Sequence, residues 1–158
     1  MAIELDDLYR EILLDHYRNP RNRGSLDGRR THAADGANPL CGDELTLELR
    51  VADGRITDVA FAGKGCSISQ ASVSMMTVYL KDRPVEEALA AVETFQRMMV
   101  GGEPPPEEFG DVEALAGVAK FPVRVKCASL AWKTLEQALI RDADTTVVNT
   151  DERTTRDG

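Results

Sequence analysis

Pro39-Leu40-Cys41-Gly42-Asp43 is the stretch on which the organisation of this chain depends, because it places a thiol and a carboxylate two residues apart. In an extended segment, residues i and i+2 point to the same side, so Cys41 and Asp43 can face one point in space. Gly42 between them leaves the backbone room to bend. The stretch therefore predicts a place where two side chains that bind metal ions lie together.

The chain has only two further cysteines, Cys66 and Cys127. A zinc site takes about four ligands drawn from thiolate, imidazole and carboxylate, and Cys41, Asp43, Cys66 and Cys127 supply that number. The long intervals between the cysteines match no zinc motif, and no C-x-x-C is present. Spacing alone leaves open the alternative of three unrelated buried thiols, because free cysteine is among the most buried residue types.

The residues beside the cysteines favour a reactive or metal-bound set over an inert one. Buried structural thiols sit in apolar runs, whereas Lys64, Arg124 and Lys126 lie close in sequence to these thiols. Neighbouring cations favour the thiolate, which is the form that binds metals and attacks electrophiles.

Length, composition and charge narrow the possible classes of protein. A length of 158 residues fits one domain, and 42% hydrophobic with 5% aromatic residues predicts a mostly aliphatic core. The formal net charge of −8 argues against a general nucleic-acid or anionic-membrane binder. No apolar run approaches the roughly 20 residues of a spanning helix, and the first residues do not resemble a signal peptide. Three cysteines cannot form a closed disulfide framework, so we expect a cytoplasmic, reducing location.

Hydrophobic periodicity predicts an α+β fold in a single domain over residues 1–142. Alternating residues predict strands over 44–51 and 56–61, which Asp53-Gly54 joins as a hairpin, and a third antiparallel strand near 32–37. Helices are expected over about 5–18, 68–81, 85–99, 111–117 and 123–141. The result is a three-stranded antiparallel sheet packed by about five helices. Residues 143–158 lose apolar periodicity and are expected to form a polar, mobile tail.

These elements place the candidate ligands at three different positions. Cys41 and Asp43 fall on a connection between strands near one end of the sheet. Cys66 falls at the start of one helix, where unpaired N–H groups and the positive end of the helix dipole stabilise a thiolate. Cys127 falls in the first turns of the last helix.

The two histidines and a group of arginines have less specific interpretations. His16 is expected to be a helix histidine with satisfied hydrogen bonds, and His32 a surface residue. The arginines fit either a solvated loop or a docking patch for an acidic partner surface. They are Arg18, Arg21, Arg23, Arg29 and Arg30.

Three motifs carry a resemblance to a known family. They are Pro39-Leu-Cys-Gly-Asp43, Gly63-Lys-Gly-Cys-Ser-Ile-Ser-Gln70 and Arg124-Val-Lys-Cys-Ala-Ser-Leu-Ala-Trp132. Together they resemble the cysteine motifs of the IscU/NifU-like iron–sulfur assembly family, over nearly the whole chain from about Leu5 to about Leu139. The chain is most similar to the SufU branch, because Lys126 stands where the IscU scaffold has a histidine and an extra stretch occupies about 101–118.

The resemblance implies an IscU/SufU-like fold and a zinc-dependent sulfurtransferase in iron–sulfur cluster assembly. A pyridoxal-phosphate cysteine desulfurase of the SufS type would leave a persulfide on its own cysteine, and a thiolate of this chain would take the outer sulfur. Downstream SUF assembly proteins would then receive it. Zinc lowers the nucleophilicity of a bound thiolate, so one thiolate has to leave the metal when the partner docks.

Each candidate residue has a role in this hypothesis. Cys41, on a glycine-containing connection, is the expected sulfur acceptor, whereas Cys66 and Cys127 act as anchors. Asp43 is the oxygen ligand, and Arg124 is a candidate for tuning charge or hydrogen bonding around the site.

The alternative is a scaffold on which a [2Fe–2S] cluster is assembled, with the three thiolates and Asp43 as ligands. Lys126 counts against it, because an ammonium group cannot ligate iron where the scaffold branch has a histidine. A structural zinc with no role in transfer is a third reading.

Overall fold

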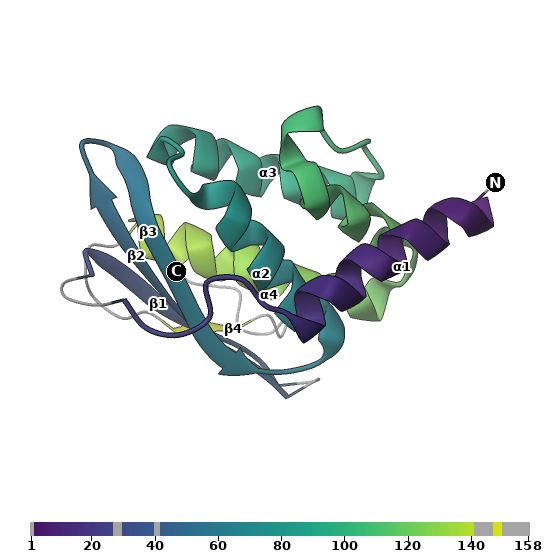
Figure 1. Cartoon of the computed structure of the whole chain (residues 1–158), viewed down its shortest axis with the longest axis horizontal. Coiled ribbons are helices and arrows are strands. Elements are labelled where there is room, and N and C mark those ends of the chain that lie inside the picture. Colours follow the sequence, from purple (N-terminus) through teal and green to yellow (C-terminus); the bar gives the residue numbers. More distant parts are fainter. Residues whose placement is uncertain (1, 27–29, 40–41, 141–146, 150–158) are drawn as a thin grey trace.

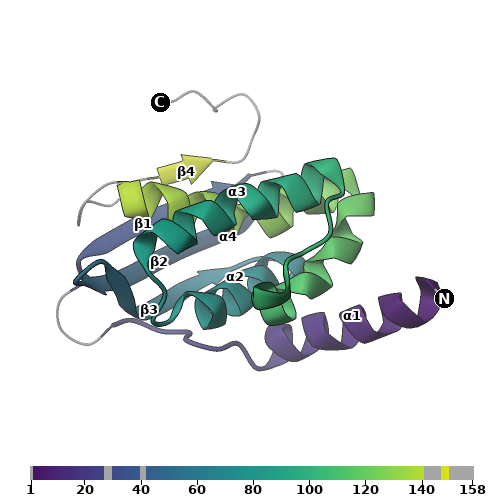
Figure 2. The same cartoon turned by 90° about the horizontal axis from the view of Figure 1, so that it is seen from above.

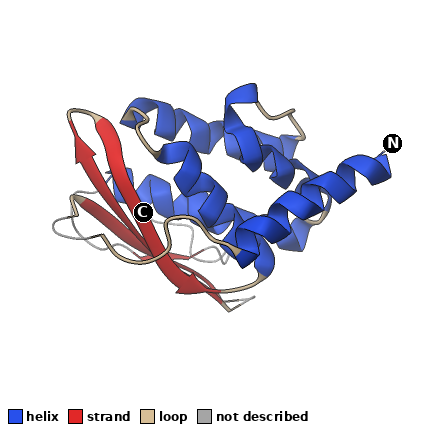
Figure 3. Ribbon diagram, in the orientation of Figure 1, coloured by secondary structure: helices blue, strands red, loops and turns tan. Residues whose placement is uncertain are grey.

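An antiparallel sheet and a layer of helices build this α+β protein (Figure 1, Figure 3). The computed structural model describes residues 2–26, 30–39, 42–140 and 147–149. The strands are β1 (His32–Asn38), β2 (Asp43–Ala52), β3 (Arg55–Lys64) and β4 (Val147–Asn149). The helices are α1 (Ala2–Arg18), α2 (Ser67–Leu80), α3 (Val85–Gly101), the 3₁₀ segment η1 (Glu107–Lys120) and α4 (Pro122–Ile140).

The first three strands form the predicted antiparallel meander, with β2 at its centre. The predicted hairpin between β2 and β3 is confirmed: Asp53 and Gly54 both have positive φ, of 54° and 76°, as the favoured two-residue hairpin turns require. Leu45, Leu47 and Leu49 are buried at every second position of β2. This alternation turns one face of the sheet toward the helices.

A fourth strand extends the sheet beyond the predicted three. β4 pairs parallel with β1, so the strand order is β3-β2-β1-β4. Three residues carry too little local periodicity to mark a strand, and pairing with the open edge of β1 forms it instead. β4 falls within the stretch 143–158 that the sequence analysis assigns to a tail; residues 143–146 and 150–158 lie outside the described part, and the tail stays a prediction.

Two helices, α2 and α4, form the centre of the core. Eleven residues of α2 between Ser69 and Leu80 are buried. The helix contacts α1, α4, η1 and β3. α4 packs on β1 and β2, and at Gly36 a Cβ atom would overlap Thr134 of α4. Figure 2 shows these layers from above, with α3 lying beside α4. The two helices that position the candidate metal ligands Cys66 and Cys127 are thus packed along their length.

The segment expected as a short α-helix over 111–117 is a longer 3₁₀ segment, η1, interrupted at Gly110. Phe109, Val112, Leu115 and Val118 are buried at intervals of three residues. A 3₁₀-helix has three residues per turn, so this spacing turns Val112, Leu115 and Val118, which follow the interruption at Gly110, to one side. The period of three, visible in the sequence, is the physical reason for the difference.

An aromatic cluster joins the helices around Trp132 of α4. Its ring stacks on Phe95 of α3 at a centroid distance of 4.6 Å, and Tyr79 of α2 meets Phe109 of η1 edge to face at 5.5 Å. The buried Trp132 indole N–H donates to Ser72, at 3.2 Å, and the Ser72 hydroxyl donates to the Ala128 carbonyl. Trp132 is the one tryptophan of the chain, so its fluorescence reports on this core.

Gly63→Ala should destabilise the protein. Gly63 has φ 151°, and an added Cβ would overlap the backbone carbonyl of Glu44 on the neighbouring strand. We expect a loss of about 2–4 kcal/mol in the free energy of unfolding, because backbone atoms have to move. Urea unfolding followed by Trp132 fluorescence measures it. The matched control is Gly101→Ala, where a Cβ meets nothing within 4 Å; equal stability of the two variants would contradict the prediction.

Candidate metal site

The Asp43 carboxylate lies buried at the first residue of β2, with 1% of the residue exposed. Its Oδ1 accepts a hydrogen bond of 2.9 Å from the backbone N–H of Cys66. Its Oδ2 has no hydrogen-bond partner among the described residues. A buried carboxylate oxygen without a partner is costly unless a cation compensates it, so this oxygen is suited to ligate a metal ion.

Cys66 occupies the N-cap position of α2, with extended backbone angles (φ −71°, ψ 169°) and no side-chain cap hydrogen bond. Its carbonyl accepts the first helical bond, from the Gln70 N–H at 3.1 Å. Its half-buried thiol therefore lies at the end of α2 where unpaired N–H groups favour negative charge. The predicted position at a helix start agrees with the structure.

Gly65 allows Asp43 to approach this corner. A Cβ at Gly65 would overlap Oδ1 of Asp43 and the hydroxyl of Ser69. Unlike Gly63, whose substitution would meet backbone, Gly65 faces the ends of two side chains. The absence of a side chain at Gly65 therefore serves the position of the Asp43 carboxylate.

Cys127 brings the third donor from α4. It is fully buried, in the second turn of the helix, and its Sγ lies 3.9 Å from the Val123 carbonyl. One carboxylate oxygen of Asp43 and the sulfur atoms of Cys66 and Cys127 all lie within 4.8 Å of one another. Three of the four predicted ligands thus meet in space from a strand and two helices far apart in the sequence.

The two other predicted site residues are Cys41 and Arg124. Cys41 lies outside the described residues, so its place among the ligands stays a prediction. Its neighbour Gly42 has φ 72°, a left-handed turn directly before β2. Arg124 is exposed in the first turn of α4, three residues before Cys127. It lines a pocket beside the site together with Ser67, the residue after Cys66.

The donor set fits a zinc ion better than a hard cation. Two sulfur donors exclude magnesium and calcium, which prefer oxygen ligands, whereas zinc and iron–sulfur centres accept thiolate. The buried Asp43 carboxylate, whose Oδ2 has no hydrogen-bond partner among the described residues, adds an oxygen donor to the two sulfur donors. The arrangement can therefore hold a thiolate-binding metal with Asp43, Cys66 and Cys127 as three of its ligands.

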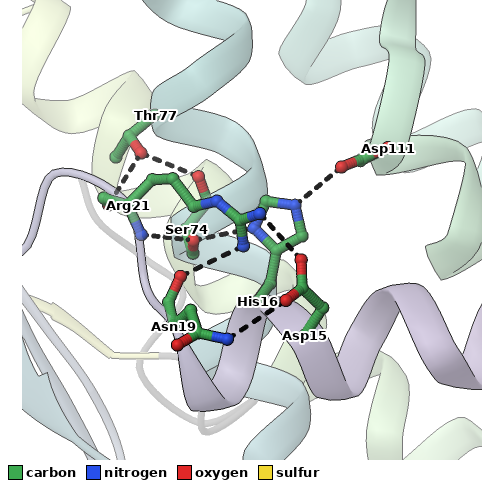
Figure 4. Close-up of polar contacts among 7 residues, drawn as sticks. All are labelled: Asp15, His16, Asn19, Arg21, Ser74, Thr77 and Asp111. Atoms are coloured by element: carbon green, nitrogen blue, oxygen red, sulfur yellow. Dashed lines mark hydrogen bonds and ion pairs between the residues drawn. The ribbon is translucent and has the colours of Figure 1, made fainter.

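A second polar cluster surrounds His16, whose ring is 1% exposed (Figure 4). His16 Nδ1 lies 2.8 Å from Ser74 Oγ of α2, and Nε2 lies 2.8 Å from Asp111 Oδ2 of η1. The Ser74 hydroxyl also accepts the Arg21 N–H. Every group is satisfied when Nε2–H donates to Asp111 and Ser74 O–H donates to Nδ1. This agrees with the expectation that His16 is a helix histidine with satisfied hydrogen bonds.

The order Ser74–His16–Asp111 matches that of a hydrolase triad, but the chemistry does not follow. Ser74 is fully buried within α2, so its hydroxyl cannot reach a substrate. The cluster instead ties α1 and η1 to α2, the helix that Cys66 caps. The sequence indicates the satisfied histidine but not its partners, because these lie 58 and 95 residues away along the chain.

The arginine group bonds largely to its own chain. Arg21 pairs with Asp15 at 2.7 Å, Arg23 donates to the Gly63 carbonyl and Arg30 pairs with Glu48 at 2.9 Å. Arg29 lies outside the described residues. For the described members, these contacts favour the interpretation as a solvated loop.

No helix in the described part of the chain combines the length and apolar character needed to cross a membrane. The fold and the converging donors define a metal-binding α+β protein with the site at one end of the sheet. The chain belongs to the family described as the NifU-like N-terminal domain, which matches residues 8–128.

Relatives in this family carry two descriptions. The chain is 45% identical to the zinc-dependent sulfurtransferase SufU of Bacillus subtilis, over 87% of this chain and 93% of that one. It is also 45% identical to the iron–sulfur cluster assembly scaffold protein IscU of Streptococcus pyogenes, over 89% and 88%. A crystal structure from Fervidobacterium islandicum, assigned as an iron–sulfur cluster assembly scaffold for the SUF system, superposes with a TM-score of 0.74 at 34% identity, covering 82% of this chain and 94% of that one.

Gly65→Ala should weaken zinc binding while leaving the fold intact. The new Cβ displaces the Asp43 carboxylate and the Ser69 hydroxyl, side-chain ends that can move without the backbone. We expect the affinity for Zn²⁺ to fall about 10–100-fold, the usual effect of disturbing a group that positions a ligand. Competition with a chromophoric chelator measures it, with Gly101→Ala as control. An affinity equal to that of the control would contradict the role of Gly65.

Proposed function

We propose that this protein is a zinc-dependent sulfurtransferase, which accepts persulfide sulfur from a pyridoxal-phosphate cysteine desulfurase of the SufS type for iron–sulfur cluster assembly. The observation that carries the proposal is the convergence of Asp43, Cys66 and Cys127, together with a buried Asp43 oxygen that has no hydrogen-bond partner in the described chain. The similarity to a relative described as a zinc-dependent sulfurtransferase supports the same conclusion.

The ligand set that we propose is Cys41, Asp43, Cys66 and Cys127. A bound zinc ion would keep cysteine side chains in the thiolate form at neutral pH. Asp43 is held by the Cys66 N–H, and Cys66 and Cys127 are each fixed by a buried helix. These contacts support a fixed role for the three described donors, and we assign the role of the thiol that leaves the metal to Cys41.

The proposed transfer is a thiol–disulfide type exchange. The Cys41 thiolate attacks the outer sulfur of the desulfurase persulfide, and a new S–S bond forms on Cys41. The original S–S bond breaks, and the desulfurase cysteine leaves as a thiolate that carries the electron pair. The proton of the outer sulfur, where present, stays on the transferred atom. No external oxidant or reductant is required.

Arg124 has a proposed supporting role in this step. It is exposed at the start of α4, on the same end of the helix as Cys127. A guanidinium there favours the anionic persulfide that approaches and the thiolate that leaves. Downstream SUF assembly proteins would consume the product.

A scaffold function, with a [2Fe–2S] cluster on the same ligands, is the second candidate. The similarity to a relative described as a scaffold favours it. Lys126 argues against it, because the residue before Cys127 has no donor atom suited to iron. Native mass spectrometry of the protein with a SufS-type desulfurase and cysteine discriminates the two: one zinc and added sulfur support the transferase, and iron with inorganic sulfide supports the scaffold.

Removal of zinc should lower the melting temperature. The ligands join one strand to two helices, so zinc binds the folded state and stabilises it, by about 2.7 kcal/mol when free zinc is 100 times the dissociation constant. Calorimetry with and without a chelator measures the shift. Cys66→Ser removes a ligand and serves as control, since its melting temperature should respond little to the chelator. No change in the wild type after verified zinc removal would refute the prediction.

Cys41→Ala should keep the fold and much of the zinc but accept no persulfide, because the three remaining donors still converge. Alkylation of the wild type after reaction with a desulfurase and cysteine, followed by peptide mass spectrometry, should find the added sulfur on Cys41. Added sulfur on Cys66 or Cys127, or sulfur uptake by Cys41→Ala at the wild-type rate, would overturn the assignment.

A further inference from the structure

A pocket of about 590 Å³ opens directly beside the metal site, between α1, η1 and the first turns of α2 and α4. Its volume lies in the range of about 300–1,000 Å³ typical of binding pockets. Ser67, which follows Cys66, lines it on one side, and Arg124, one helical turn before Cys127, lines it on another. The pocket is therefore lined by residues one position after Cys66 and three positions before Cys127 in the chain.

The charge of the pocket opposes that of the whole protein. Arg10, Lys120 and Arg124 line it together with the apolar Leu13 and Ile68, and none of its lining residues is acidic. The protein as a whole has a net charge of −8. A local group of three cations on an acidic protein attracts negative groups toward this one place.

Tyr9, which also lines the pocket, does not change the positive charge of the lining. Burial first, and the nearby Glu113 carboxylate second, raise the pKa of Tyr9 above its ordinary value. The phenol therefore stays neutral at neutral pH and adds apolar surface rather than charge.

The apolar surface continues past the mouth of the pocket. Phe121, which lines it, is 57% exposed, and Val123, two residues along, is 69% exposed. A single exposed apolar side chain is ordinary, but apolar side chains beside a pocket with arginines at its edge have the composition of a protein-binding surface. A small ligand would need the pocket alone, so the exposed residues favour a protein as occupant.

We propose that this pocket docks an acidic segment of the sulfur-donating partner, with an apolar side chain of that segment in the cavity and its carboxylates against Arg10, Lys120 and Arg124. The inference rests on the proposed function and deepens it by naming the surface and the chemistry of the partner segment. Docking here brings the donor persulfide to the end of the sheet where the thiols converge.

Two variants test the charged and the apolar halves of the surface separately. Arg10→Glu reverses a side chain that is 71% exposed and pairs with Asp7 at a long distance of 3.9 Å, so the fold should tolerate it. Phe121→Ser removes an exposed aromatic ring. Lys81→Glu is the matched charge control, because Lys81 follows the opposite end of α2, roughly 20 Å from Cys66. Val100→Ser, at an 83% exposed position in α3, is the apolar control.

The experiment measures desulfurase turnover with this protein as the sulfur acceptor, using a purified SufS-type enzyme and cysteine. Arg10→Glu should raise the KM for the acceptor about tenfold at low ionic strength, with kcat unchanged, and added salt should shrink the difference. Phe121→Ser should raise KM without that dependence on salt. Both controls should behave as wild type, and all variants should keep the zinc content of the wild type.

Each other outcome is distinct. Sulfur transfer by Arg10→Glu and Phe121→Ser with the KM of their controls would overturn the docking surface and leave the sulfurtransferase function standing. Failure of the wild type itself to accept sulfur would refute the proposed function. A wild-type dimer in sedimentation that Phe121→Ser converts to monomer would assign the surface to a second copy of this chain and overturn the proposal.

Discussion

The structure around the site depends on one buried charge. Asp43 is almost fully enclosed, yet only one of its carboxylate oxygens is hydrogen-bonded within the described chain, to the Cys66 N–H. Enclosing such a group is unfavourable unless a cation compensates it. The fold meets this constraint by ending β3 and starting α2 at the carboxylate and by bringing Cys127 of α4 to the same point. A metal ion held by these residues would supply the compensating positive charge.

Two neighbouring glycines show how the scaffold serves this corner. Gly63 lets β3 pass close to the backbone of β2, which is a requirement of folding. Gly65 leaves space for the Asp43 carboxylate, which is a requirement of the site. Behind them α2 is held along its length by Ser72, which accepts from Trp132, and by Ser74, which contacts His16. Rigid elements that carry the donors keep a ligand set in register.

The distribution of charge connects the site to a partner. The chain as a whole carries a formal net charge of −8, which disfavours binding to polyanions. Beside the converging donors the sign is reversed, because Arg10, Lys120 and Arg124 line one pocket. In the proposed function, attraction confined to the surface where the reacting atoms meet would give the site specificity for its partner.

The sequence by itself determined the local elements: alternating leucines defined β2, Asp53-Gly54 defined the hairpin, and the types of the candidate donors indicated the chemistry. Only the tertiary structure decided that β4 pairs with β1, that His16 contacts residues of two other helices, and that Asp43, Cys66 and Cys127 lie within 4.8 Å. The physical reason is range: periodicity and turn chemistry act over a few residues, whereas these contacts arise when distant segments bury a common core.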